Sequence, residues 1–282
     1  MIELMAIQLQ AQQDAALRLP IAGKEIEVFT YKPRSYAGER MIMVLHGTLR
    51  NADEYRNDAR AMGDRFGALI VAPKFDSERF PSIKYQRGGI LKEDGTPAPR
   101  SEWTYALIPQ IFTAIKKRER KPNLKYWIIG HSAGGQFVLR MAGFQKTGAE
   151  RMVAANPGSD LFPTRDMPFG YGFGNLPDSL ADDKVIQSYL AQPLTLYLGT
   201  ADNGPDEYFD DSPSAMKQGP GRYQRGLASY EYAMKLAAQR GWRFGWSLVK
   251  APGIGHDHTA MFNHPACERA LFGQFLPVQS SR

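Results

Sequence analysis

Residues 125–144 constrain the fold more than any other part of this sequence. They open with an apolar, aromatic run at 126–129, which is typical of a buried strand. The pentapeptide Gly-His-Ser-Ala-Gly follows at 130–134, and apolar residues then recur at helical spacing. A strand that gives way to a helix within so few residues needs a sharp turn, and the two glycines allow neighbouring backbone to approach closely. We therefore predict a strand, a strained turn that exposes the hydroxyl of Ser132, and a helix.

Two later strand ends carry the partners that such a serine needs. A serine hydroxyl is a poor nucleophile at neutral pH until a base takes its proton, and the base needs an orienting acid. Asp202 follows the apolar run 194–199, and His256 follows the run 244–249 and a glycine-rich turn. Three other carboxylates compete for the acid role from deeper in a polar loop: Asp206, Asp210 and Asp211. We predict Ser132, Asp202 and His256 as nucleophile, acid and base.

The base has a second candidate two residues farther along the chain. His258 stands close to the start of an expected helix, where it could also cap the helix or line the pocket rim. Only one ring can meet both Ser132 and Asp202, because proton transfer requires contacts of about 3 Å. We favour His256, which directly follows a glycine at the extension of the last strand, and keep His258 as the alternative base.

Three motifs together resemble those of the α/β-hydrolases. They are Leu-His-Gly-Thr at 45–48, the Gly-x-Ser-x-Gly nucleophile elbow at 130–134, and Gly-His at 255–256. The order serine, aspartate, histidine is also that of the α/β-hydrolases. Within this superfamily the chain most resembles polyhydroxybutyrate-depolymerase-like esterases and polyaspartate hydrolases, over about residues 25–276. It departs from secreted depolymerases in having one cysteine, and it shows no separate substrate-binding domain.

The resemblance implies two further site residues. In the family, two backbone N–H groups form an oxyanion hole, and by position these belong to Thr48 and Ala133. The side chains of His46 and His131 lie inside the same motifs, and we interpret both as structural. We expect no cofactor and no metal.

The rest of the chain alternates strands with helices, which predicts an α/β class. We expect the α/β-hydrolase fold, with a mostly parallel central sheet and helices on both faces. The expected strands lie at 17–21, 25–31, 41–45, 68–72, 125–129, 152–155, 194–199 and 244–249, the first two paired antiparallel. The expected helices lie at 52–66, 103–115, 133–144, 223–240 and 265–275. One domain should span 17–278, after an N-terminal extension at 1–16 without fixed structure.

Three long connections leave the carboxyl ends of expected strands, at 73–102, 157–178 and 203–222. In α/β sheets this edge carries the binding sites. The second connection is rich in glycine and aromatic residues, and we predict that four of them form a pocket wall: Phe162, Phe169, Tyr171 and Phe173. Such a wall suits an apolar or mixed substrate. The acidic cluster at 206–211 lacks metal-ligand spacing, so we interpret it as a solvated loop.

These observations predict a serine hydrolase that cleaves a carboxylic ester, such as a polyester or oligoester, through an acyl-enzyme. A polyaspartate-type hydrolase that cleaves amide bonds of an anionic polymer is the alternative. The loops near Ser132 carry several cations that suit such an anionic polymer: Arg50, Lys74, Arg79, Lys84, Arg87, Arg165, Arg222 and Arg225. Acids occur there in comparable numbers, so both activities stay open and we favour the esterase. A non-catalytic α/β-hydrolase-fold binding protein is a remote alternative, because it would need none of the motifs.

The net charge and the composition limit the kinds of partner that we expect this protein to bind. The net charge is +6, but the densest basic run, 116–121, closes an expected helix at the sheet end opposite Ser132. We interpret this run as cations that interact favourably with a helix C-terminus, and not as a nucleic-acid-binding site. No apolar run approaches the roughly 18 residues of a membrane span, so we expect no membrane partner. The expected partners are a small or polymeric ester and, as an open case, a second copy in a homodimer.

The expected location follows from two features. Residues 1–18 lack the basic, apolar and small-residue segments of a signal peptide. The single Cys267 lies in a helical stretch, where it fits helix packing and a reducing compartment. We therefore expect a cytoplasmic protein, or a secreted or periplasmic one if a signal peptide has been removed.

Overall fold

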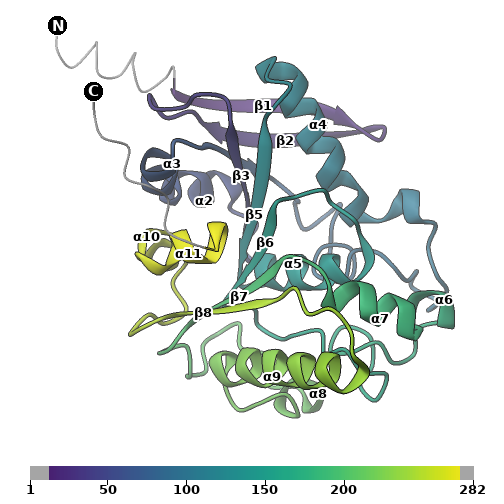
Figure 1. Cartoon of the computed structure of the whole chain (residues 1–282). Helices are drawn as coiled ribbons and strands as arrows, with labels where there is room; N and C mark the ends of the chain where they lie inside the picture. The colour runs from purple at the N-terminus through teal and green to yellow at the C-terminus, as the bar shows by residue number, and fades with distance from the viewer. Residues whose placement is uncertain (1–12, 274–282) are drawn as a thin grey trace, which may run out of the picture.

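An eight-stranded sheet forms the centre of the computed structural model, which describes residues 13–273 (Figure 1). The strands are β1 (Asp14–Ile21), β2 (Lys24–Tyr31), β3 (Arg40–Leu45), β4 (Leu69–Pro73), β5 (Lys125–His131), β6 (Arg151–Ala155), β7 (Leu194–Gly199) and β8 (Ser247–Ala251). Their order is β1-β2-β4-β3-β5-β6-β7-β8. The pairs from β4 to β8 are parallel, and the pairs of β2 with β1 and β4 are antiparallel. The prediction of a mostly parallel sheet is confirmed.

The antiparallel hairpin of β1 and β2 is also as predicted. Ala22 and Gly23 connect the strands with φ angles of 49° and 72°, and positive φ at both central residues is the requirement of a type I′ hairpin turn. β1 begins at Asp14, so residues 14–16 of the expected extension belong to the sheet. Residues 1–12 lie outside the described part of the chain.

Helices cover both faces of the sheet, as the alternating pattern predicts (Figure 1). The α-helices are α2 (Ala52–Asp58), α3 (Arg60–Phe66), α4 (Leu107–Glu119), α5 (Ala133–Phe144), α6 (Asp178–Ala181), α7 (Asp183–Leu190), α8 (Pro213–Met216), α9 (Arg222–Arg240), α10 (His258–Asn263) and α11 (Ala266–Phe272). Two short 3₁₀ helices, η1 (Arg100–Glu102) and η2 (Thr104–Ala106), precede α4. Residues of α4, α5, α7 and α9 join one buried apolar cluster, and residues of α2, α3, α10 and α11 join a second.

Several predicted boundaries differ from the structure, three of them for reasons that the contacts or the backbone show. The last strand begins at Ser247 because the N–H of Gly245 donates to the Leu190 carbonyl (2.8 Å), which ties this segment to α7. The helix expected from 103 starts at Leu107, after the 3₁₀ turn. The helix expected over 52–66 is interrupted at Ala59 and forms α2 and α3.

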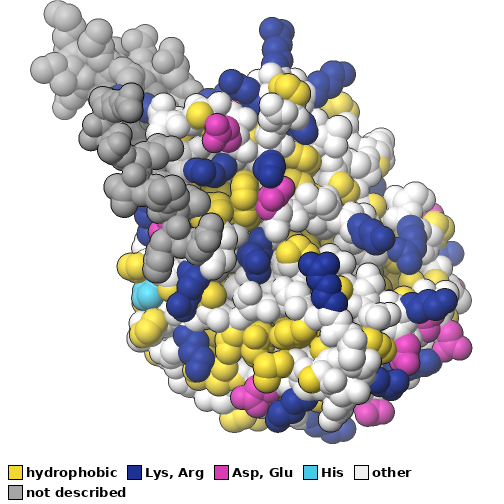
Figure 2. Space-filling model, in the orientation of Figure 1, with side chains coloured by type: hydrophobic (Ala, Val, Ile, Leu, Met, Phe, Trp, Pro, Cys, Tyr) yellow, Lys and Arg dark blue, Asp and Glu magenta, His cyan; other side chains and the backbone are white. Residues whose placement is uncertain are grey.

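The surface charges, the helices and Cys267 bear on the partners and the location that the sequence predicts. On the described part of the face in Figure 2, Lys and Arg side chains lie scattered among neutral and apolar ones. No helix within residues 13–273 is both long and apolar enough to cross a membrane. Cys267 is buried in α11, where burial raises the pKa of its thiol to about 12. A thiol that stays protonated at neutral pH is a packing residue, as the sequence predicts.

The parallel strands bring distant segments to one edge. The carboxyl ends of β3, β5, β7 and β8 lead directly into residues 46–48, Ser132, residues 200–202 and residues 252–256. β3 and β5 are neighbours, and so are β7 and β8. The four segments singled out from the sequence therefore belong to one edge of the sheet.

Candidate active site

Ser132 occupies the sharp turn that the sequence predicts. Its φ and ψ angles are 57° and −118°, a conformation that costs free energy for any residue with a side chain. Its N–H donates to the Ala155 carbonyl on β6 (3.1 Å). A Cβ on Gly130 would lie 2.2 Å from the Gly134 carbonyl oxygen, and one on Gly134 would lie 2.2 Å from that of Leu45. The turn therefore needs both glycines, because β5, α5 and β3 meet there in backbone contact.

Asp202 and His256 form a hydrogen-bonded pair. The Nδ1 atom of His256 lies 2.8 Å from Oδ2 of Asp202. A carboxylate can only accept, so Nδ1 carries the proton and Nε2 of a neutral ring is left with a free lone pair. The ring of His131, the residue before Ser132, lies 4.6 Å from the His256 ring. The structure thus brings the predicted acid and base together beside the turn that carries Ser132.

Arg222, the first residue of α9, holds the second oxygen of Asp202. Its Nη1 lies 3.3 Å from Oδ1 of Asp202, and both side chains are almost completely buried. The same guanidinium donates two bonds to Asp206, at 2.7 and 2.8 Å. Asp206, one of the rival acids, therefore supports Arg222 instead of meeting His256. An arginine in this place keeps a negative charge on Asp202 favourable inside the protein.

Asp210 and Asp211, the other rival acids, have different surroundings. Asp210 accepts a hydrogen bond from the Tyr171 hydroxyl (2.8 Å) and is part of the cavity wall described below. Asp211 is exposed. Among the described residues, His256 pairs with neither of them.

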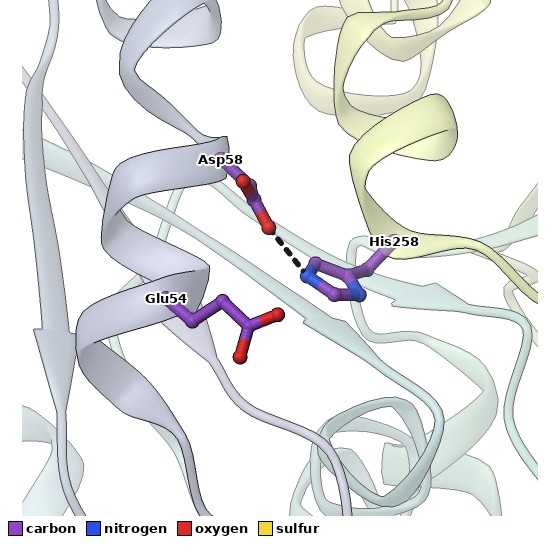
Figure 3. A group of neighbouring side chains, drawn as sticks. All are labelled: Glu54, Asp58 and His258. Carbon is purple, nitrogen blue, oxygen red and sulfur yellow. Dashed lines mark hydrogen bonds and ion pairs between the residues drawn. The ribbon is translucent and has the colours of Figure 1, made fainter.

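His258, the alternative base, pairs with a different carboxylate. Its Nε2 lies 2.8 Å from Oδ2 of Asp58, the last residue of α2 (Figure 3). Its ring stacks on Tyr55 with centroids 4.0 Å apart and an angle of 4° between the planes. The structure therefore directs His258 to α2 and away from Asp202.

Glu54 lies beside this second pair and completes a group with the ligand types of a cation site (Figure 3). One donor atom from each of Glu54, Asp58 and His258 lies within 4.8 Å of the others. Glu54 is exposed, and Asp58 and His258 already satisfy each other by a direct hydrogen bond. Two members of the group are therefore already occupied by a hydrogen bond to each other.

His131 is completely buried. Burial lowers the pKa of His131 well below its ordinary value, and the nearby charges of His256, His258 and Arg222 lower it further. The ring is consequently neutral. The Tyr55 hydroxyl lies 3.4 Å from its Nδ1, so the ring joins α2 to the turn as a structural residue.

His46 is buried and neutral as well. Its Nδ1 lies 3.0 Å from the Gly47 carbonyl, and its Nε2 accepts the N–H of Phe75 (3.0 Å). Burial lowers the pKa of His46 to about 3. Its ring stacks on Tyr85, whose hydroxyl donates to the His46 carbonyl (2.8 Å). Both ring nitrogens are used in holding the loop that carries Thr48, which is the structural role the sequence suggests.

A cavity of about 500 Å³ lies beside Ser132. Thr48 and Ala133, the predicted oxyanion residues, are part of its wall together with Ser132. Ala133 is the first residue of α5, and the first N–H groups of a helix have no acceptor within the helix. Its N–H is therefore of the kind that can stabilise a negative oxygen.

The cavity wall mixes polar, charged and apolar groups, and its aromatic rings are those of Tyr171 and Tyr208. Apart from Thr48, Ser132 and Ala133, it consists of Ser82, Ile83, Gln86, Arg87, Gln136, Arg140, Gly158, Ser159, Tyr171, Tyr208, Asp210 and Arg222. Of the four predicted wall residues only Tyr171 is among them. The other three, Phe162, Phe169 and Phe173, are not part of this wall.

The other three predicted wall residues pack inside the protein. Phe169 and Phe173 contact Phe144 of α5, at ring distances of 5.6 and 5.3 Å. Phe162 contacts Tyr232 of α9, at 5.7 Å. All three phenylalanines are less than 9% exposed. Burying an aromatic ring in the core is worth more than leaving it at a wet cavity, and the polar residues of the connection are left to face the site.

Sequence reasoning missed Arg140, Gln136 and Ser159, which all belong to the cavity wall. A signal for Arg140 was present in the sequence. Every residue of α5 is buried, and Arg140 is the only charged residue among them. A charged side chain is rarely buried unless it serves a partner or a ligand.

The sheet topology, the strained serine turn and the pair of His256 with the buried Asp202 at strand ends together define an α/β-hydrolase. Among solved structures, the poly(3-hydroxybutyrate) depolymerase LpqC from Bordetella parapertussis is 33% identical, with a TM-score of 0.84 over 96% of this chain and 95% of that chain. Poly(aspartic acid) hydrolase-1 from Sphingomonas sp. KT-1 is 34% identical, with a TM-score of 0.82 over 88% of this chain and 95% of that chain.

An S-formylglutathione hydrolase from Agrobacterium tumefaciens shares the fold at 18% identity and a TM-score of 0.52, over 89% of this chain and 91% of that chain. No family model and no curated protein sequence matches the chain. The chain belongs to the same α/β-hydrolase family as the depolymerase and the poly(aspartic acid) hydrolase, and it is a hydrolase.

Proposed function

We propose that this protein is a serine hydrolase that cleaves a carboxylic ester through an acyl-enzyme intermediate. The observation that carries the proposal is the 2.8 Å hydrogen bond between His256 and Asp202, at the sheet edge where the strained turn presents Ser132. A buried carboxylate on Nδ1 fixes the ring tautomer that a general base requires.

The steps follow from this arrangement. Nε2 of His256 takes the proton of the Ser132 hydroxyl as its oxygen attacks the substrate carbonyl. The backbone N–H groups of Thr48 and Ala133 stabilise the negative oxygen of the tetrahedral intermediate. His256 then gives the proton to the leaving alcohol, and a water molecule repeats the sequence to release the acid. Asp202 stays ionised and stabilises the charged imidazole.

Two kinds of substrate agree with the relatives. The depolymerase suggests a polyester or oligoester, and the poly(aspartic acid) hydrolase suggests amide bonds of an anionic polymer. The second receives support from the cavity wall, which carries the cations Arg87 and Arg140. A substrate panel separates them: release of fragments from β-linked aspartate oligomers compared with hydrolysis of short acyl esters.

The nucleophile is tested by Ser132→Ala. Removing the hydroxyl should lower turnover by about 10⁶-fold and leave only binding and oxyanion stabilisation. A fluorophosphonate probe should label the wild-type protein and not the variant. A folded variant that keeps a tenth of wild-type activity would show that Ser132 is not the nucleophile. Absence of both labelling and hydrolysis in the wild type would instead favour a binding protein.

A further inference from the structure

We propose that Glu54, Asp58 and His258 form a binding site for a divalent transition-metal ion of the Zn²⁺ type, and that the ion links α2 to the start of α10. None of the three residues belongs to the cavity wall beside Ser132. The site is therefore separate from the candidate active site, and the inference does not depend on the proposed hydrolase activity.

Two helices bring the three side chains together. Glu54 and Asp58 stand four residues apart on α2, a spacing that places both on one face of a helix. His258 is the first residue of α10, and the three side chains point toward one another (Figure 3). Asp58 and His258 are 200 residues apart in the chain. Sequence spacing could not reveal the group for that reason, and the tertiary structure creates it.

The spacing of the donor atoms is close to that of ligands around one ion. Two ligands bonded to the same Zn²⁺ at about 2.0–2.2 Å lie no more than about 4.4 Å apart. One donor atom from each residue lies within 4.8 Å of the others, and Nε2 of His258 lies 2.8 Å from Oδ2 of Asp58. Glu54 is exposed, so its side chain can rotate to close the remaining distance. Small side-chain movements thus give three protein ligands, with water in the other positions.

The ring of His258 is held in place by its neighbours. It stacks on Tyr55 with centroids 4.0 Å apart, and it contacts the edge of Phe262 at 5.9 Å. Both of these partners are buried, at 4% and 0% exposure. Contacts that fix the orientation of a ligating ring favour metal binding, because less freedom is lost when the ion binds. His258 is therefore better prepared as a ligand than a freely rotating surface histidine.

Negative charge gathers around the group without a basic side chain to balance it. Burial raises the pKa of Tyr55, and the charges of Glu54, Asp58 and Asp257 raise it further, so three carboxylates act on one ring. In the part of the chain that the structure describes, no Lys or Arg nitrogen lies within 4 Å of these carboxylates. Such a concentration of negative charge attracts a cation.

The donor types select the kind of cation. A carboxylate can only accept, so Nε2 of His258 carries the proton of its hydrogen bond to Asp58. A bound metal takes the lone pair of Nε2 and replaces that proton, while Nδ1 carries the proton of the neutral ring. One imidazole nitrogen with two carboxylates suits Zn²⁺, whereas Ca²⁺ takes six to eight oxygen ligands.

The test titrates Zn²⁺ calorimetrically into chelator-treated protein. We expect one ion per chain, with affinity lowered at least about tenfold in His258→Ala and in Asp58→Asn. His256→Ala is the matched histidine control, and Asp53→Asn, an exposed acid of α2 outside the group, is the matched carboxylate control. Both controls should bind as the wild type does. Ca²⁺ should bind the wild type at least about tenfold more weakly than Zn²⁺.

Two further measurements separate a metal site from loss of folding. Glu54→Gln changes an exposed side chain, so a folded variant with about tenfold weaker binding would support the site. Zn²⁺ at about 100 times its Kd should raise the Tm of the wild type by about 5 °C, and that of His258→Ala by much less. Absence of stoichiometric binding to the wild type would overturn the proposal. So would full binding by folded His258→Ala, loss of binding in folded His256→Ala, or equal affinity for Ca²⁺.

Discussion

Two histidine–carboxylate pairs stand two residues apart in this protein, and their hydrogen bonds have the same length. His256 meets Asp202 and His258 meets Asp58, each at 2.8 Å. The histidines are also equally exposed, at 19% and 20% of their side chains. The carboxylates differ: 2% of the Asp202 side chain is exposed, against 27% for Asp58.

The difference lies in what holds each carboxylate. Asp202 follows β7 at the sheet edge and has Arg222 behind it, whereas Asp58 ends α2 at the surface. A buried, ionised acid with a fixed position can orient an imidazole and stabilise its charge, while a partly solvated one does so weakly. A His–Asp contact alone therefore does not identify a catalytic pair, and the surroundings of the acid decide.

Replacing each histidine by alanine should produce the largest difference in activity between the two pairs. We expect His256→Ala to lower kcat/KM for an ester by about 10⁴- to 10⁶-fold, because it removes the base that takes the proton of Ser132. His258→Ala should cost less than about tenfold, since it removes only a packing and surface contact. Steady-state kinetics on both folded variants provide the measurement. An inactive His258 variant beside an active His256 variant would exchange the roles of the two pairs.

The next test concerns the two acids. Asp202→Asn should lower kcat by about 10³- to 10⁴-fold, because an amide that donates to Nδ1 stabilises the wrong ring tautomer. Asp58→Asn should change kcat by less than about threefold. The ratio of the two effects measures how much the burial of Asp202 contributes. Similar losses in both variants would mean that the surface pair also serves catalysis.

The smallest effect is expected for His131, whose ring lies 4.6 Å from that of His256 and 5.8 Å from that of His258. Burial depresses its pKa in the folded protein, so below pH 6.5 the unfolded chain binds a proton that the native ring does not. Stability from this residue is therefore present above pH 6.5 and is lost as the pH falls. Between pH 7.5 and 5.5 the wild type should lose about 1.4 kcal/mol more than His131→Gln, measured by urea unfolding. Parallel pH profiles would mean that the ring is protonated in the folded state.

The mostly parallel sheet and the pairing of Asp202 with His256 could be predicted from the sequence. Strand patterns and glycine positions report local chemistry directly, so the turn at Ser132 and the ends of β3, β5 and β7 could be located. The start of β8 could not, because the Gly245 bond to Leu190 is a contact with another element. Asp202 was preferred to its rivals because it lies nearest the strand, and the structure pairs it with His256.

The pocket was harder to predict for a physical reason. Phe169 and Phe173 could line a cavity or fill the core, and composition does not distinguish the two. Their partner Phe144 lies in α5, and only the tertiary structure brings the connection onto that helix. Arg140 carried a usable signal, since it is the only charged residue of a buried helix, but the cavity beside it is visible only in three dimensions.

The placement of the site on separate strand ends has a consequence for folding. Thr48, Ser132, Asp202 and His256 follow β3, β5, β7 and β8, so the site joins residues more than half the chain apart. Contacts between such distant residues form slowly, because long loops must close before the contacts can repay the lost entropy. Recovery of ester hydrolysis during refolding should therefore lag behind recovery of helical signal. Catalysis would then report the closure of the last strand onto the sheet.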